Sequence, residues 1–454
     1  MGMALHGLGR RAAALAALDR ALALDGAMVV VPGNRGHILA DMGRWSEARA
    51  AFRQAVAAAP EVAAGWRNHG AACHHADALV ESEAACRRAM LLDPPDIGTI
   101  IQLATTLERA GRAGEARLLY AEAAHHRAVV VEPCLGGPPQ ARVLIICGRG
   151  AANVPTEILF DRRRFETITL NLAPPGTDGP ALAELVAGLP PYDVAFSALG
   201  DGRADDPFVA QGTALAQLLD RPLLNPPARI PPTCREALPT LLAGIPGLVV
   251  PATGRMTRAE VEQASRAGGL AWPLLIRPIG SHGGEGLCKT ASPAELAAYL
   301  GRVSFESFHV TGFVDYASGD GYYRKYRFIF VDRRVYAYHL VIHTDWLVHY
   351  FRAEMDRDAW RRREEELFLA DYRQVFAGDA AEAVAEAARR LDLDYGGMDC
   401  ALTRDGRVLV FEANACMLVH LHDSPEDFAY KHQHVPRIVE AVGRMVLARA
   451  TPPG

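Results

Sequence analysis

Small and large apolar residues recur in the first third of the chain with a period of about 34 positions. The clearest unit carries Gly43, Trp45, Ala48, Phe52, Ala55 and Pro60. Matching residues lie one period later (Trp66, Gly70, Ala89, Pro94), two periods later (Leu103, Ala104, Leu107, Gly111, Ala116, Tyr120, Ala123) and one period earlier (Gly9, Ala14, Leu18, Ala21). Small residues let paired helices approach closely and Pro ends a helix, so the pattern predicts an array of helical hairpins over about residues 5–128.

This array resembles the tetratricopeptide repeat in both its period and its residue pattern. The resemblance implies a concave surface that binds a peptide or a protein, so this third of the chain indicates recognition more than chemistry. The middle unit departs from the pattern, because Ser82 and Cys86 stand where Ala and an aromatic residue are usual. The alternative is an Ala-rich helical bundle whose spacing is accidental.

A different pattern begins after residues 132–140, a segment rich in Pro and Gly that predicts a linker. Residues 141–148 are an apolar run typical of a buried strand, and residues 192–202 contain another. The segment 181–189 between them has helical spacing. Alternation of strand and helix predicts a parallel sheet with a ligand-facing edge at the carboxyl ends of its strands.

The segment 272–290 is the first that indicates chemistry. It predicts a strand, a Gly-rich loop and a second short strand, and the loop carries Gly280, Ser281, Gly283, Gly284 and Gly286. Glycines let backbone N–H groups approach phosphate oxygens closely. The loop is not a Walker loop, because no Gly-Lys-Ser/Thr follows and no helix begins at the glycines. A bare turn is an equal alternative.

A carboxylate-bearing hairpin over residues 395–414 is the sharpest local signal. Its two strands are joined by Asp405-Gly406, a favoured pair for a two-residue turn. That register places Asp399 directly opposite Glu412, with Asn414 further along the same face. Opposed carboxylates repel, so they need a cation, and oxygen ligands of this kind select a hard ion such as Mg²⁺. Solvated acids at an exposed strand end are the alternative.

Composition narrows the class of protein. The chain has 454 residues, of which 50% are hydrophobic, and a net charge of −5. These values exclude a disordered chain and a small disulfide scaffold, and the negative balance argues against a general nucleic-acid binder. No apolar stretch reaches the roughly 18–20 residues of a membrane-spanning helix. We therefore expect a cytoplasmic protein that binds neither nucleic acid nor membrane.

Two residue types add to this picture. The eight cysteines are scattered without a C-x-x-C pair, so neither a zinc framework nor a disulfide framework is indicated. Lys and Arg together number 48, yet the only lysines are Lys289, Lys325 and Lys431. So strong a bias predicts Arg at sites where related proteins carry Lys.

The order of these segments resembles the ATP-grasp superfamily, especially the branch with glutathione synthetase and the ribosomal-protein glutamate ligase. A strand with a basic residue and a Gly-rich hairpin come first, followed by a basic strand at 322–331 and the D…E-x-N hairpin. The resemblance covers about residues 141–445. It implies an α+β multidomain chain with a tetratricopeptide-like solenoid (1–131), a linker (132–140), an α/β pre-ATP-grasp domain (141–225) and a two-lobed ATP-grasp catalytic domain (226–454).

The resemblance also implies roles for individual residues. Asp399, Glu412 and Asn414 match the Mg²⁺ ligands, and Arg327 matches the Arg that faces the γ-phosphate and the acyl phosphate. Arg277 and Arg235 stand where the family has phosphate-contacting Lys, and the glycine-rich loop covers the phosphates. The hinge against adenine falls in residues 309–316, with Phe313, Val314 and Asp315 as its candidates.

Three departures from the family pattern affect these roles. Both Lys positions are Arg, which keeps the charge but changes the geometry of the donors. The hinge lacks the usual Glu, which leaves Asp315 as its candidate. Lys325 stands where many relatives have Asp, and its retention in a Lys-poor chain indicates a catalytic role beside Arg327.

The expected reaction is ATP-dependent activation of a carboxylate, with release of ADP and phosphate and formation of an amide or related bond. The repeats favour a peptide, protein or carrier-bound substrate with a small-molecule co-substrate, as in peptide modification or biosynthesis; a homodimer stays open. His343, Asp345, Trp346 and His349 are candidates for the acceptor site, with a structural role equally expected. A phosphotransferase and a nucleotide-binding scaffold are the alternatives.

Overall fold

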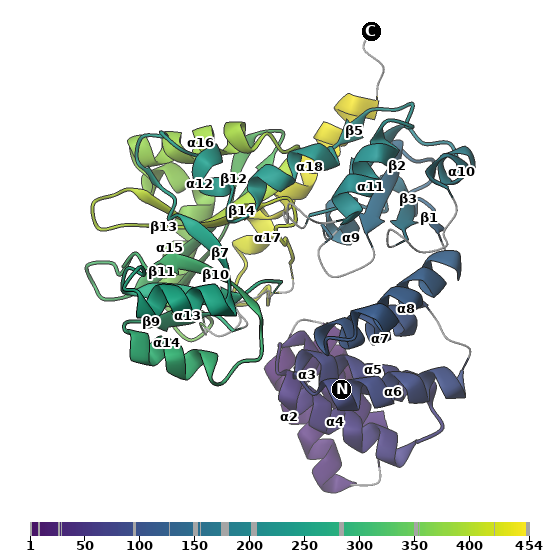
Figure 1. The fold of residues 1–454 in the computed structure, drawn as a ribbon. Coiled ribbons are helices and arrows are strands. Elements are labelled where there is room, and N and C mark those ends of the chain that lie inside the picture. Colours follow the sequence, from purple (N-terminus) through teal and green to yellow (C-terminus); the bar gives the residue numbers. More distant parts are fainter. Residues whose placement is uncertain are drawn as a thin grey trace.

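The computed structural model describes residues 2–7, 10–25, 28, 30–93, 97–126, 128–148, 153–154, 156–173, 181–200, 207–280, 286–348, 353, 355–421 and 423–450. Over these ranges the chain forms a helical array followed by three β-sheets with their covering helices (Figure 1). The predicted fold class, a helical solenoid followed by α/β domains, is confirmed. Among the described helices, none combines the length and the apolar character that crossing a membrane requires.

The array occupies the N-terminal third of the chain and appears in purple and blue in Figure 1. Its helices are α1 (Gly2–Gly7), α2 (Arg11–Leu24), α3 (Val30–Asp41), α4 (Trp45–Ala58), α5 (Ala63–His75), α6 (Leu79–Leu92), α7 (Ile97–Arg109) and α8 (Ala113–His126). A Cβ on Gly36 would lie 2.7 Å from the ring of Phe52, so this glycine lets α3 and α4 approach closely. Two buried clusters, one around Phe52 and one around Leu103, form the core of the array.

The first sheet follows the array and has the strand order β1-β3-β2-β4-β5. Its strands are β1 (Val129–Glu132), β2 (Ala141–Gly148), β3 (Phe165–Leu172), β4 (Val194–Ser197) and β5 (Leu223–Leu224), with helices α9 (Thr156–Leu159), α10 (Leu182–Ala187) and α11 (Pro207–Ala216). Strands β2 to β5 pair in parallel, as the alternation of strand and helix predicts.

The segment after the array is part of this sheet. Strand β1 pairs antiparallel with β3, although its first three residues were predicted to belong to the solenoid and Glu132 to the linker. Further along, Leu135 donates to the carbonyl of Arg162 at 2.7 Å and Gln140 to that of Arg164 at 2.8 Å. These bonds hold residues 129–140 against the α/β domain, so a truncation that removes only the array should begin near residue 128.

Two further sheets form two lobes. The small lobe has the order β7-β10-β8-β9, with β7 (Thr253–Thr257), β8 (Leu274–Pro278), β9 (Cys288–Thr290), β10 (Ser307–Gly312) and helices α13 (Arg258–Arg266) and α14 (Pro293–Leu300). The large lobe has the order β12-β11-β13-β14-β6, with β6 (Leu248–Val249), β11 (Tyr323–Val331), β12 (Arg334–His343), β13 (Tyr395–Leu402) and β14 (Val408–Asn414). Its helices are α12 (Leu238–Leu241), α15 (Ala359–Ala370), α16 (Asp379–Leu391), α17 (Lys431–His434) and α18 (Pro436–Ala450).

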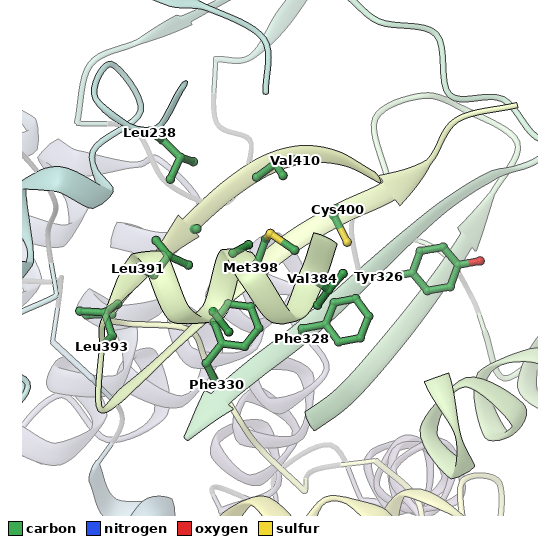
Figure 2. Close-up of a cluster of buried hydrophobic side chains, with 14 of the residues drawn as sticks. Leu238, Tyr326, Phe328, Phe330, Val384, Leu391, Leu393, Met398, Cys400 and Val410 are labelled. Carbon is green, nitrogen blue, oxygen red and sulfur yellow. The ribbon is translucent and has the colours of Figure 1, made fainter. Parts of the chain in front are cut away.

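The two faces of the large sheet differ in character. On one face Phe328 and Met398 lie beside Val384 of helix α16, as Figure 2 shows, and Tyr326 packs against Phe368 of helix α15. Side chains alternate between the faces of a strand, so Arg327 and Asp399 point to the other face. The second face is packed as well, because Ile329 and Tyr395 join a second core cluster with Val442 of helix α18, and the charged residues share this face with it.

The turn of the carboxylate hairpin differs from the prediction. Gly406 donates to the carbonyl of Thr403 at 2.9 Å, and Thr403 donates to the carbonyl of Arg407 at 2.9 Å. The loop therefore has three residues, with Gly406 in the left-handed region at φ +79, and the predicted two-residue turn is wrong. A three-residue loop shifts the register by one, and a bulge at Phe411 shifts it back, so Asp399 does lie opposite Glu412.

Candidate functional site

Four ionisable residues form a row across the large sheet. On neighbouring antiparallel strands, Arg327 lies opposite His339 on one side and opposite Asp399 on the other. Asp399 in turn lies opposite Glu412. Directly opposed residues share a face of an antiparallel pair, so the row His339, Arg327, Asp399, Glu412 runs over the charged face of the sheet.

Asp399 is the centre of this row and has no solvent exposure. Arg327 donates to it through two N–H groups, at 2.6 and 2.8 Å, and Lys325 Nζ lies 2.6 Å from Oδ2. Burial alone would raise the pKa of Asp399, but Arg327 and Lys325 outweigh it and hold this pKa far below its usual range. The cations that the sequence analysis required beside the two carboxylates include these side chains of strand β11.

Glu412 has a different cation. Arg235, which precedes helix α12, pairs with Glu412 Oε2 and also donates to the carbonyl of Phe411 at 3.2 Å. Burial opposes ionisation of Glu412, but Arg235 prevails and lowers its pKa. The two side chains are 29% and 27% exposed, so this pair lies at the open edge of the row.

His339 ends the row on strand β12 and is almost fully buried. Burial and the neighbouring Arg327 lower its pKa well below the usual value, so the ring is neutral at physiological pH. Two carboxylates and three cations (Arg235, Lys325 and Arg327) therefore leave a formal charge of +1. A local charge of this sign favours an anionic ligand.

The small lobe contributes Arg277, which lies opposite His309 on one face of its sheet. His309 Nε2 is 3.1 Å from Glu236 Oε1, and Glu236 follows Arg235 directly in the chain. Burial lowers the pKa of His309 and Glu236 counters it, while Arg235 and Arg277 lower it further. Both arginines therefore act on the same histidine, and Arg235 also pairs with Glu412 of the large sheet.

Residues 309–312 of the predicted hinge belong to strand β10 of the small lobe, and residues 313–316 follow it on the way to the large lobe. Phe313 donates its N–H to the carbonyl of Pro273 at 3.0 Å, and its ring meets Trp346 edge-on at 5.8 Å. Lys289 Nζ lies 3.6 Å from the centre of the Phe313 ring, a contact that the sequence analysis missed. Asp315 accepts from the N–H of Ala317 at 3.1 Å, and Val314 packs against the main core.

The remaining candidates are the glycines next to β8 and β9 of the small lobe and Asn414 at the end of β14. Gly280 and Gly286 have φ values of +81 and +64, and a Cβ on Gly286 would lie 2.7 Å from Pro278. Ser281, Gly283 and Gly284 lie outside the described residues. Asn414 lies two residues beyond Glu412, and its Oδ1 accepts from the N–H of Cys416 at 3.1 Å.

Comparison with known proteins supports the repeat. Residues 33–62, which cover most of α3 and α4, match the family model of the tetratricopeptide repeat, so the predicted repeat is confirmed there. MamA from Desulfovibrio magneticus RS-1 is similar over 28% of this chain and 71% of its own, with 25% identity and a TM-score of 0.27. No curated protein matches the chain.

Two solved ligases are similar to the larger part of the chain. A D-alanine–D-alanine ligase from Bacillus anthracis, crystallised with ATP, is similar over 69% of this chain and 99% of its own, with 14% identity and a TM-score of 0.42. The VanG D-Ala:D-Ser ligase from Enterococcus faecalis is similar over 67% and 98%, with 13% identity and a TM-score of 0.43.

Proposed function

We propose that this chain is an ATP-dependent carboxylate ligase of the ATP-grasp type. In this reaction a substrate carboxylate takes the γ-phosphoryl group of ATP, ADP leaves, and an amine displaces phosphate from the acyl phosphate. The observation that carries the proposal is the charged row on the large sheet, together with Arg235, which pairs with Glu412 at its open edge. The combination of clustered cations and two carboxylates suits a polyphosphate that arrives with a divalent ion.

The donor set fits Mg²⁺ in its chemistry. Asp399, Glu412 and Asn414 offer only oxygen atoms, as hard cations prefer. Both oxygens of Asp399 already face Arg327 and Lys325, so Glu412 and Asn414 at the open edge would hold such an ion first. Bound there, Mg²⁺ would neutralise charge on the polyphosphate.

The cations of the site have distinct tasks in this proposal. Arg277 and Arg235 hold the polyphosphate from the two lobes, and Arg327 with Lys325 faces the charge that develops on the transferred group. Their contacts with Asp399 hold the side chains of Arg327 and Lys325 in place before the ligand arrives, so these side chains need little reorganisation when it binds. The ring of Phe313, covered on one side by Lys289, offers a flat surface for the base.

The substrate is proposed to be a peptide, a protein or a carrier-bound carboxylate. A repeat array with its own buried core is an extended recognition surface. Binding remote from the reacting group lets a ligase select one large substrate without changing its catalytic residues.

The test uses hydroxylamine as a general amine. The full chain is incubated with Mg-ATP, hydroxylamine and a panel of amino acids and short peptides, and hydroxamate is measured together with ADP and phosphate. The proposal predicts hydroxamate in equal amounts with ADP for one class of carboxylate, and its loss in Arg327→Ala. Arg324→Ala is the matched control, because Arg324 lies on the same strand but pairs with Asp320 and Glu364.

Two outcomes would contradict the proposal. ADP formation with a stable phosphorylated product and no hydroxamate would indicate a phosphotransferase. Binding of ATP without any substrate-dependent ADP would indicate a scaffold.

A further inference from the structure

The middle repeat of the array carries two buried polar residues, His69 and Cys73, at positions where the following repeat has leucine. Cys73 is one period from Leu39 and from Leu107, and all three are buried. His69 is one period before Leu103 and is only 4% exposed. A buried imidazole or thiol adds less apolar contact than leucine and brings polar atoms that need partners. Packing alone therefore does not explain these two substitutions.

A third change in the same repeat frees a carboxylate from its usual partner. In the neighbouring repeats Arg44 pairs with Glu47 at 2.7 Å and Arg112 with Glu115 at 2.6 Å, three residues apart. The corresponding residues of the middle repeat are Ala78 and Glu81, so the local arginine is missing.

Glu81 instead contacts Cys73 and Arg49. The Cys73 thiol donates to Glu81 Oε2 at 3.6 Å, and Arg49 of helix α4 lies 2.8 Å from the same carboxylate. His69, Cys73 and Glu81 thereby come together from helices α5 and α6.

The spacing of the three side chains matches a metal site. Their ligand atoms all lie within 4.8 Å of one another. Cys73 Sγ is 3.6 Å from His69 Nε2 and 3.6 Å from Glu81 Oε2. Zinc bonds of about 2.0–2.3 Å in tetrahedral geometry separate ligand atoms by about 3.6 Å. The pair distances measured from the sulfur are those of a preformed tetrahedral edge.

We propose that His69, Cys73 and Glu81 form a binding site for a divalent transition metal of the zinc class. Nitrogen, sulfur and oxygen donors suit this borderline ion better than Mg²⁺, which prefers oxygen alone. A thiolate and a carboxylate together neutralise the double charge. On binding, the sulfur–hydrogen bond breaks, a sulfur–metal bond forms, and the proton passes to solvent.

The site has access from outside and an open ligand position. His69 and Glu81 line a pocket of about 630 Å³ that Trp66, Arg53 and Arg88 also border. Burial lowers the pKa of His69, so its ring is neutral and can offer a nitrogen lone pair. Three protein ligands leave the fourth tetrahedral position to water or to a group from a partner that enters this pocket.

Cobalt is the probe for this site. The full chain is treated with a chelator and titrated with Co²⁺, and thiolate-to-cobalt charge transfer is followed in the near-ultraviolet. We expect the band to saturate at one Co²⁺ per chain and to disappear when Zn²⁺ is added. Asp399, Glu412 and Asn414 contain no sulfur, so Co²⁺ bound by them gives no such band.

The variants use the neighbouring repeats as templates. Cys73→Leu restores the residue of both flanking units and His69→Leu that of the following unit, so each should keep the helical circular-dichroism signal while losing the band. Glu81→Gln, at a side chain 39% exposed, should weaken Co²⁺ binding at least about tenfold. Cys86→Ala is the matched control, because Cys86 is an equally buried thiol of the same repeat outside the cluster.

Three results would overturn the proposal. The first is a wild-type chain that gives no thiolate-to-cobalt band. The second is a band that survives Cys73→Leu or is lost equally in Cys86→Ala. The third is unchanged affinity in Glu81→Gln, a variant at a partly exposed position that leaves the buried core intact.

Discussion

Replacing Asp399 by Asn removes the buried negative charge that Arg327 and Lys325 share. The carboxylate has no solvent exposure and receives three close contacts from the two cations, between 2.6 and 2.8 Å. The amide has nearly the same volume, so the change removes charge without opening a cavity. Breaking a buried pair from one side costs about 3–5 kcal/mol, because the remaining charges stay buried without a counter-ion.

Glu412→Gln is the matched comparison for this prediction. Its partner Arg235 is 29% exposed and can turn to water, and loss of Glu412 also relieves repulsion with the opposed Asp399. We expect a cost below about 1 kcal/mol. The two residues lie directly opposite each other on neighbouring strands. The predicted loss of unfolding free energy is nevertheless severalfold larger for Asp399→Asn than for Glu412→Gln.

The assay is differential scanning calorimetry of the full chain. At about 2–4 °C per kcal/mol, Asp399→Asn should lower the unfolding temperature of the two-lobed region by at least about 6 °C, and Glu412→Gln by at most about 4 °C. Equal shifts for both variants, or no shift for Asp399→Asn, would refute the account of the row.

At low pH the parent chain and Asp399→Asn should approach the same free energy of unfolding. The folded pKa of Asp399 is depressed, so its contribution is present above the unfolded value of about 3.9 and is lost as the pH falls toward the lower folded value. The stability gap should stay constant between about pH 5 and about pH 8 and narrow below about pH 4. A gap that narrows already at neutral pH would mean that Asp399 is not held ionised.

The other predictions concern the ligand and the array. Arg277→Ala should weaken ATP binding by roughly 10- to 150-fold through loss of a charge-assisted contact, while Arg277→Lys should keep much of the affinity. Titration calorimetry measures both affinities, and an unchanged affinity in both variants would exclude Arg277 from the site. Glu412→Gln should abolish Mg-ATP turnover at near-normal stability, so a fully active variant would exclude Glu412 as a ligand. A chain that begins at Ala128 should stay folded and bind ATP. Compared with the full chain, it should show a raised KM for the full acceptor and an unchanged KM for a minimal fragment of it. The same KM for the full acceptor in both chains would exclude recruitment by the array.

Local patterns were enough to predict much of the fold. The helix pairs of the array follow from small residues at regular spacing, and the parallel strands follow from apolar runs such as 141–148. Strand β1 was missed, because four residues at a sheet edge have no pattern of their own and are held by pairing with β3. Edge pairing of this kind is decided by tertiary contacts.

The sequence predicted the opposed carboxylates of the candidate site but not the contacts of Asp399 with its cations. The opposition of Asp399 and Glu412 is confirmed, but two deviations that cancel, a longer loop and a bulge, produce it. The ties from Arg327 and Lys325 to Asp399 were not predicted, because they depend on which strand lies beside β13. The scarcity of lysine was the signal that marked Lys325, and the same signal could have marked Lys289, whose contact with the Phe313 ring was missed.

The metal cluster of the middle repeat shows a limit of spacing rules. Scattered cysteines without a C-x-x-C pair indicate no zinc framework, yet His69 and Cys73 lie one helical turn apart and Glu81 comes from the next helix. Comparison with the following repeat would have found the cluster, because Leu103 and Leu107 stand there at the positions of His69 and Cys73. In a repeat protein, the equivalent positions of the other repeats thus show which residue packing alone would favour, and a departure from that residue indicates another role.

Transfer of ¹⁸O tests the central claim most directly, because only activation through an acyl phosphate moves oxygen from the substrate to phosphate. The carboxylate that supports hydroxamate formation is labelled with ¹⁸O, and the phosphate released in the presence of Mg-ATP and an amine is examined by mass spectrometry. The account predicts one ¹⁸O atom in each phosphate released by the parent chain and no labelled phosphate from Arg327→Ala. Turnover by the parent chain that releases only unlabelled phosphate would contradict it.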